Sequence, residues 1–77
     1  MTAEVYGSFG CGYCRRAKSL LKAREIEYRE FIVGQDISGD DLSTKIGKPA
    51  LTVPQIFLDG EYIGGYTELA ARLGVSG

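Results

Sequence analysis

The chain has 77 residues, of which 44% are hydrophobic and 25% are charged, and its net charge is −1. This length fits one small globular domain over residues 1–77. The near-neutral charge gives no overall field for nucleic acid, and no stretch approaches the ~20 apolar residues of a membrane span. The first residues show no signal-peptide pattern. We expect a cytoplasmic monomer that binds neither nucleic acid nor membrane.

The first third of the chain predicts a strand, a loop and a helix. Ala3–Tyr6 should be a short strand, and a glycine-rich loop follows it. Ala17, Leu20 and Leu21 are apolar at helical spacing, which predicts a helix over Gly12–Arg24. Five Lys and Arg residues lie between positions 15 and 24. We interpret most of them as the solvated face of this helix.

Two cysteines, Cys11 and Cys14, stand three residues apart at the start of this helix. They are the only cysteines, and the chain has no histidine. A structural zinc site takes four Cys or His ligands, so one chain cannot supply it. Residues three apart share one side of a helix, which brings the two Cα atoms within disulfide reach. The pattern favours a reversible dithiol, although two cysteines can also be small buried apolar residues.

The position of Cys11 at a helix N-terminus favours a reactive thiolate. Unpaired backbone N–H groups and the helix dipole stabilise negative charge at that end. Arg15 and Arg16 follow within the first turns and add positive charge. We expect these effects to lower the pKa of the Cys11 thiol below that of a free cysteine.

The remaining chain predicts three strands and two helices. They are a strand at Glu27–Val33, a helix at Asp40–Ile46 capped by Ser38, strands at Gln55–Leu58 and Glu61–Ile63 joined by Asp59-Gly60, and a helix at Glu68–Leu73 capped by Thr67. The imperfect alternation of the second strand suits a strand covered on both faces. Gly74–Gly77 should fray. The order β-α-β-α-β-β-α predicts an α/β fold, a four-stranded mixed sheet with helices on both faces.

Three segments together resemble the dithiol glutaredoxins of the thioredoxin-like fold. They are Cys11-Gly12-Tyr13-Cys14, Thr52-Val53-Pro54-Gln55-Ile56-Phe57 and Ile63-Gly64-Gly65-Tyr66-Thr67-Glu68-Leu69. The likeness covers nearly the whole chain and is greatest to short bacterial and phage glutaredoxins that serve ribonucleotide reductase. The resemblance implies a strand order of 2-1-3-4 and a cis peptide bond between Val53 and Pro54.

The resemblance also implies a function and a set of site residues. Cys11 and Cys14 would be catalytic, and glutathione would be the electron donor, with no metal required. The glutathione contacts would come from Tyr13, Thr52, Val53, Pro54, Gly65, Tyr66, Thr67 and Glu68. The outward backbone of Val53 would pair with a substrate beside Cys11. Substrates would be disulfide-containing or glutathionylated proteins, with ribonucleotide reductase as one candidate.

Two departures from the family pattern leave questions open. Ser8 stands where a Lys or Arg is common, and Arg15, Lys45 or Lys48 are the candidates to replace that charge. Gly12 stands where proline is common.

Two alternative functions remain. One is a redoxin that receives electrons from thioredoxin reductase, but such proteins usually have a different segment at positions 64–68. The other is a carrier of an iron–sulfur cluster, held by Cys11 and glutathione between two subunits.

Overall fold

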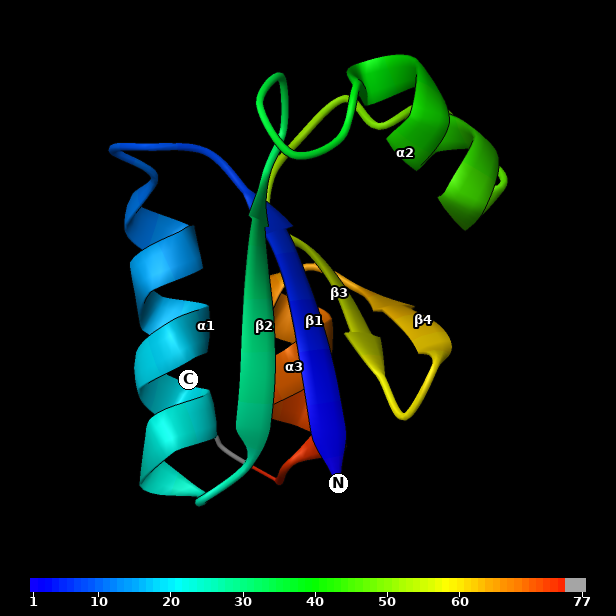
Figure 1. The fold of residues 1–77 in the computed structure, drawn as a ribbon. Coiled ribbons are helices and arrows are strands. Elements are labelled where there is room, and N and C mark those ends of the chain that lie inside the picture. The colour runs from blue at the N-terminus through cyan, green and yellow to red at the C-terminus, as the bar shows by residue number, and fades with distance from the viewer. Residues whose placement is uncertain (75–77) are drawn as a thin grey trace.

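The computed structural model describes residues 1–74, and its elements follow the predicted order (Figure 1). In chain order they are β1 (Thr2–Gly7), α1 (Gly12–Ala23), β2 (Glu27–Ile32), α2 (Gly39–Ile46), β3 (Gln55–Leu58), β4 (Glu61–Gly64) and α3 (Tyr66–Arg72). The predicted bounds of the first six elements are confirmed to within one residue at each end. Most of the segment expected to fray, from residue 75 onward, lies outside the described residues.

The four strands form one mixed sheet in the order β2-β1-β3-β4, as the resemblance implied. β1 is parallel to β2 and antiparallel to β3, and β4 returns antiparallel to β3. The turn before β4 is the predicted hairpin. Asp59 and Gly60 both have positive φ, 48° and 84°, which is the conformation that a two-residue turn matching the strand twist requires.

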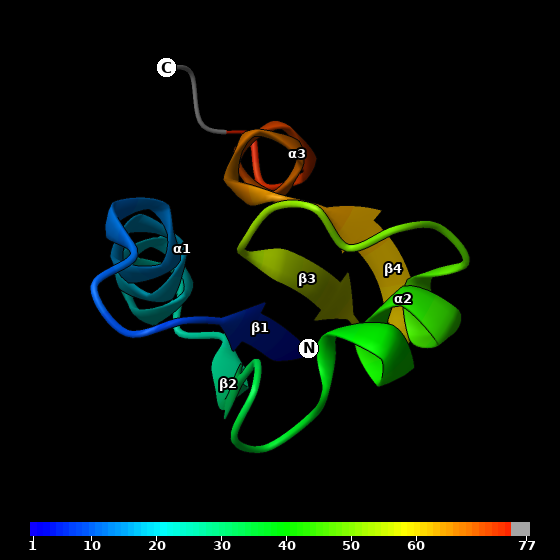
Figure 2. The same ribbon diagram turned by 90° about the horizontal axis from the view of Figure 1, so that it is seen from above.

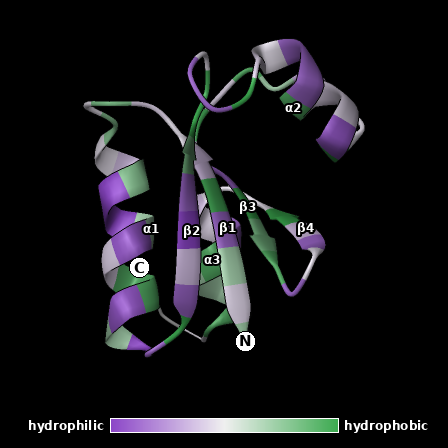
Figure 3. Cartoon of the chain, in the orientation of Figure 1, coloured by the Kyte–Doolittle hydropathy of each residue, from purple (hydrophilic) through white to green (hydrophobic). Residues whose placement is uncertain are grey.

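One face of the sheet is covered by α1 and α3, which lie on the same side of it in Figure 2. Hydrophobic and hydrophilic stretches alternate along α1 (Figure 3), as expected of a helix with one buried side. The core on this face consists of Ala3, Val5, Ala17, Leu21, Ile56, Leu58 and Leu69. This packing fixes the start of α1 against the end of β1.

The other face of the sheet is covered in part by α2, so helices lie on both faces as predicted (Figure 2). Leu42 of α2 is buried with Tyr6 and Phe57. The Tyr6 ring stacks on Phe31, with 4.8 Å between the ring centres. The Lys45 ammonium lies 5.2 Å from the centre of the Phe57 ring. α2 itself lies beyond the end of β1 (Figure 1), so much of its contact with the sheet is made through these side chains.

Tyr6 also has an unusual electrostatic environment within this second core. Burial raises the pKa of its hydroxyl above the ordinary value of 10.0, because the charged form loses solvent. The Glu4 carboxylate raises this pKa further by charge repulsion and by accepting a hydrogen bond from the Tyr6 hydroxyl over 3.5 Å. The neutral hydroxyl is therefore favoured in the folded state.

Two sequence-based expectations about these elements are wrong. β2 is an edge strand that pairs with β1 alone, and none of its six residues is buried. It is therefore covered only in part, with Tyr28 packed against the core on one face and Phe31 against the core on the other. Thr67 is not the cap of the last helix, which begins two residues earlier than predicted, at Tyr66, with Gly65 as its N-cap residue. The reason is that the Glu68 carboxylate accepts the Gly65 N–H over 2.7 Å, which closes the turn without a threonine hydroxyl.

The capping of α2 was predicted correctly. Ser38 is its N-cap residue, and the Ser38 hydroxyl accepts the Asp41 N–H over 3.0 Å. Gly47 ends the helix in the left-handed conformation, with φ at 79°. No helix in the described part of the chain is long and apolar enough to cross a membrane.

Candidate active site

Cys11 and Cys14 form a disulfide at the N-terminus of α1. Their Cα atoms are 5.2 Å apart, inside the range of about 4.4–6.8 Å that disulfides adopt. Cys11 is the N-cap residue in extended conformation, and the Cys14 N–H donates to Cys11 Sγ over 3.1 Å. The sulfur of Cys11 therefore occupies the place that a serine or aspartate oxygen takes in an ordinary helix cap.

The two cysteines differ in exposure. Cys14 is 1% exposed, whereas Cys11 is only partly buried. Gly7, the last residue of β1, makes room for Cys14, because a Cβ at Gly7 would lie 2.6 Å from Cys14 Sγ. A reagent from solvent therefore meets Cys11 first.

The loop before β3 lies beside the exposed cysteine. Cys11 Sγ is 3.8 Å from the Val53 carbonyl oxygen. The peptide bond between Val53 and Pro54 is cis, as the resemblance implied. These contacts join two segments that are 42 residues apart in the sequence.

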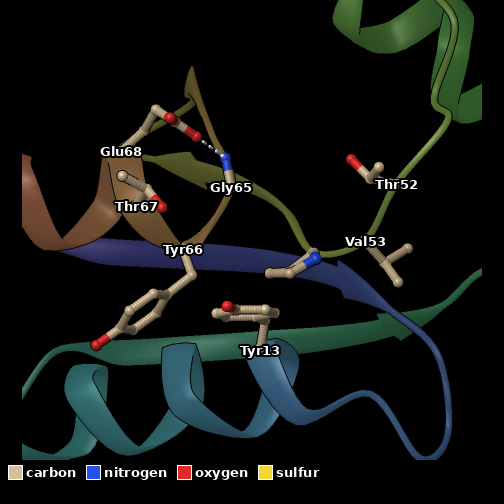
Figure 4. Close-up of a pocket in the computed structure, with 8 residues that line it drawn as sticks. Tyr13, Thr52, Val53, Gly65, Tyr66, Thr67 and Glu68 are labelled. Atoms are coloured by element: carbon tan, nitrogen blue, oxygen red, sulfur yellow. Dashed lines mark hydrogen bonds between the residues drawn. The ribbon is translucent and has the colours of Figure 1, made fainter.

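A pocket of about 170 Å³ opens next to the dithiol (Figure 4). Eight residues line it: Tyr13, Thr52, Val53, Pro54, Gly65, Tyr66, Thr67 and Glu68. These are the same eight residues that the resemblance proposed as glutathione contacts, so the fold brings the whole set together from α1, the loop before β3 and the start of α3. Figure 4 shows the Tyr13 and Tyr66 rings along one edge of the pocket and Thr52 at the opposite side.

Gly64 and Gly65 allow the chain to pass close to its neighbours at this pocket. Gly64 has φ at 116°, and a Cβ there would lie 2.8 Å from the Glu68 carboxylate. A Cβ at Gly65 would lie 3.3 Å from the Pro54 carbonyl oxygen. This glycine pair therefore allows close packing within the chain itself.

Tyr13 lies on the surface of the protein, where it is 57% exposed. Its ring centre lies 6.0 Å from that of Tyr66 and 5.3 Å from the Arg16 guanidinium carbon. The exposed ring of Tyr13 thus lines the pocket and also contacts the Arg16 guanidinium of α1.

Known proteins resemble this chain in both sequence and fold. The family model described as glutaredoxin matches residues 3–63. The chain is 44% identical to glutaredoxin 1 of Escherichia coli over 92% of this chain and 91% of that protein. The chain belongs to the glutaredoxin family. The fold agrees with this assignment, because the structure of reduced E. coli glutaredoxin superposes with a TM-score of 0.82 at 41% identity, over 96% and 94% of the two chains. A buckwheat glutaredoxin–glutathione complex superposes with a TM-score of 0.73 at 31% identity, over 94% and 69% of the chains.

This glutaredoxin is a thiol–disulfide oxidoreductase, with its Cys-x-x-Cys pair at the N-terminus of α1. Among the described residues there is no group of three or more His, Cys, Asp or Glu side chains that could hold a metal ion. An iron–sulfur cluster shared by two subunits would need only Cys11 from each, so that alternative stays a prediction.

The three basic residues that are candidates to replace a charge at Ser8 have two kinds of surroundings. Lys45 and Lys48 lie over the rings of Phe57 and Tyr62, at 5.2 and 5.4 Å. Arg15 lies instead beside Gly12, along a groove on α1. Of the three candidates to replace a charge at Ser8, both lysines are thus engaged with aromatic rings, and Arg15 is next to the dithiol turn.

Two exposed apolar residues lie close to the site along the chain and were not predicted from the sequence. Phe9 is 76% exposed and stands two residues before Cys11, and Leu51 is 86% exposed and stands two residues before Val53. Each Cα is therefore within about 7 Å of an active-site residue. Their signal in the sequence was a large apolar residue inside a loop next to a recognised motif.

Proposed function

We propose that this glutaredoxin uses glutathione to reduce protein disulfides and glutathione mixed disulfides. Glutaredoxins use glutathione as their electron donor, and a homologous buckwheat protein has been solved as its glutathione complex. The single observation that best supports the proposal is that Cys11 Sγ, which is only partly buried, lies 3.8 Å from the carbonyl oxygen of Val53, one of the eight predicted contacts that line the pocket.

The first step of the proposed reaction is attack by the Cys11 thiolate on a substrate disulfide. A bond forms between Cys11 Sγ and one substrate sulfur, the substrate S–S bond breaks, and the leaving thiolate takes a proton from water. The Cys14 N–H is placed to donate to the Cys11 sulfur throughout this step. Access and thiolate fraction both govern its rate, and both favour Cys11.

The second step resolves the mixed disulfide. For a protein disulfide, the Cys14 thiolate attacks Cys11 Sγ, the bond between Cys11 and the substrate breaks, and the substrate leaves with two reduced thiols. For a glutathione mixed disulfide, the protein thiol leaves in the first step and Cys11 is joined to glutathione; a second glutathione thiolate then attacks the sulfur of that glutathione, which forms oxidised glutathione and frees the Cys11 thiolate. When Cys14 resolves, the Cys11–Cys14 disulfide forms, and two glutathiones then reduce it and become oxidised glutathione. The Cα atoms of Cys11 and Cys14 are 5.2 Å apart, within the range of about 4.4–6.8 Å that a disulfide needs.

Binding of glutathione would use both polar and aromatic parts of the pocket. The backbone of Val53 supplies an N–H and a C=O for strand-like pairing. Tyr13 and Tyr66 offer aromatic surface along one edge. Thr67 and Glu68, in the first turn of α3, are the polar groups at the far end.

One experiment separates glutathione from the alternative electron donor. A glutathionylated peptide and a peptide disulfide are each reduced by the purified protein, coupled either to glutathione with glutathione reductase or to thioredoxin reductase. We expect turnover of both substrates in the glutathione system and little in the other. Turnover that depends on thioredoxin reductase would overturn the proposal. Ribonucleotide reductase, as the oxidised protein in the same assay, tests the candidate physiological substrate.

A further inference from the structure

A second hollow lies on the other side of Tyr66 from the proposed glutathione pocket. It is an open groove of about 920 Å³ along α1, lined by Gly12, Arg15, Arg16, Ser19, Leu20 and Tyr66. We call it the α1 groove. The residue Tyr66 borders both hollows. A molecule bound in the α1 groove would therefore leave the proposed glutathione pocket free.

The α1 groove begins at the dithiol. Gly12 stands between the two cysteines, and Leu20 lies eight residues further along the helix. At a rise of about 1.5 Å per residue the groove follows the helix for about 12 Å. An extended peptide covers that distance in about four residues, at roughly 3.3 Å each. A segment lying in the groove would thus start next to a sulfur bound at Cys11.

The charge on the α1 groove is positive and has no internal counter-charge. All ten acidic residues of the chain lie outside positions 5–24, whereas five Lys and Arg lie within them. Lys18 pairs with Glu30 over 2.8 Å. Neither Arg15 nor Arg16 makes an ion pair with any side chain in residues 1–74. Both are exposed, and the Arg16 guanidinium is held over the Tyr13 ring.

The other residues that line the α1 groove provide both apolar and polar surface. Leu20 and Tyr66 are half-buried and provide apolar surface, and Ser19 provides a hydroxyl. A small anion would not need this apolar floor. A peptide with carboxylates and an apolar side chain would use both parts.

From this geometry we infer that the α1 groove binds an acidic segment of the protein substrate, within about four residues of the substrate's reactive cysteine. The inference rests on the proposed function and adds a substrate preference to it. Arg15 and Arg16 attract the segment's carboxylates, and Leu20 and Tyr66 contact an apolar residue in it. The mixed disulfide at Cys11 holds the segment in place.

A set of three peptides tests this inference. Each peptide contains two cysteines joined in a disulfide, whose reduction passes through a mixed disulfide with Cys11, and two Glu, two Gln or two Lys residues within four positions of one of these cysteines. We expect kcat/KM to be highest for the acidic peptide, by about three- to tenfold over the neutral one at low salt, since two exposed ion pairs contribute modestly. The preference should shrink in 0.5 M salt because screening weakens exposed pairs.

The matched variants are Arg15→Gln with Arg16→Gln, and Arg29→Gln as the control. Arg29 is exposed on β2 and is not among the residues that line the α1 groove. The double variant should lose the acidic preference, and the control should keep it. An equal loss of rate for all three peptides would mean that the arginines act on the Cys11 thiolate alone, and it would overturn the inference while leaving the proposed function intact.

A binding measurement tests the α1 groove without any disulfide exchange. The same acidic peptide, with serine in place of both cysteines, is titrated against the protein, and the backbone amide NMR shifts of the protein are followed. Shifts should concentrate at Arg15, Arg16 and Ser19. Shifts elsewhere, or no preference over the basic peptide, would overturn the α1 groove as the binding site whether or not the protein proves to use glutathione.

Discussion

The Cys14 N–H donates to Cys11 Sγ over 3.1 Å, so the backbone of the buried cysteine makes a hydrogen bond to the sulfur of the more accessible one. A negatively charged sulfur accepts such a bond more strongly than a neutral one. The bond closes the first turn of α1 in the same way as a conventional N-cap. One hydrogen bond thus links the stability of the helix to the charge of the proposed nucleophile.

The reduced enzyme should reveal this link when its alkylation rate is measured against pH. We expect the iodoacetamide reaction of Cys11 to reach half its plateau well below about 8.5, the pKa of a free thiol, because helix N-terminal N–H groups and nearby arginines favour the thiolate. Mass spectrometry after partial labelling identifies the cysteine that reacts. A midpoint at the free-thiol value would show that nothing compensates for the missing basic residue at Ser8.

The two cysteines should give unequal variants. Cys11→Ser should abolish all reductase activity, because the attacking sulfur is removed. Cys14→Ser should retain reduction of glutathione mixed disulfides, which a second glutathione can resolve, and should lose most activity on protein disulfides. Both are measured with glutathione and its reductase. Equal losses in the two variants would contradict the assigned roles.

Gly7→Ala should disturb the dithiol without touching either cysteine. The new Cβ would lie 2.6 Å from Cys14 Sγ, so α1 or the end of β1 must shift. We expect a loss of about 1–3 kcal/mol in unfolding free energy, the usual cost of overpacking, and a slower protein-disulfide reaction. Gly39→Ala is the control, since a Cβ at the start of α2 meets nothing within 4 Å. The two variants are compared by denaturant unfolding, and similar stabilities would contradict the steric account.

Tyr6→Phe should alter the stability of the protein in alkali. The pKa of Tyr6 is raised in the folded state by burial and by Glu4, so the folded protein retains this proton above pH 10 longer than the unfolded chain does. Its contribution is complete below about pH 10 and is lost as pH rises through the folded pKa. Unfolding free energy measured from pH 8 to 11.5 should therefore fall more steeply in the wild type than in Tyr6→Phe. Parallel curves would argue against this role of Tyr6.

Gly12→Pro should lower the reduction potential of the dithiol. Gly12 is the first residue of α1, and a Cβ there meets nothing within 4 Å. Proline is well suited to this first helical position. Proline would restrict the backbone of the reduced form, which would then lose less conformational freedom when the disulfide closes. The disulfide form would be favoured by about 1 kcal/mol or less, which corresponds to a fall in potential of roughly 20 mV at about 30 mV per 1.4 kcal/mol. Equilibration with a glutathione redox buffer measures the change, and an unchanged or higher potential would contradict the entropic argument.

Local sequence patterns predicted the elements well because each has a local cause. The apolar spacing of Ala17, Leu20 and Leu21 defines α1, and Asp59-Gly60 has the conformational freedom that its turn needs. The strand order has no such local cause and came from the resemblance alone. The start of α3 was placed wrongly because two caps competed. Thr67 has the usual capping hydroxyl, but Glu68, three residues after Gly65, caps the earlier turn.

The site was predictable to the extent that three motifs identify it. All eight predicted pocket residues converge, although they come from three separate segments. The α1 groove was not predictable, because Arg15 and Arg16 belong to α1 and only the tertiary fold places Tyr66 beside them. The exposure of Phe9 and Leu51 likewise depends on the course of two loops rather than on residue type.

The burial of Cys14 beneath Gly7 has a consequence for how this molecule handles electrons. Cys14 can exchange electrons with another molecule only through the sulfur of Cys11, so every electron pair enters and leaves at one atom. A single adduct on Cys11 therefore stops the redox activity of the whole protein, whereas the buried sulfur of Cys14 stays protected from oxidants in solution. A regulator needs to modify or cover only the sulfur of Cys11.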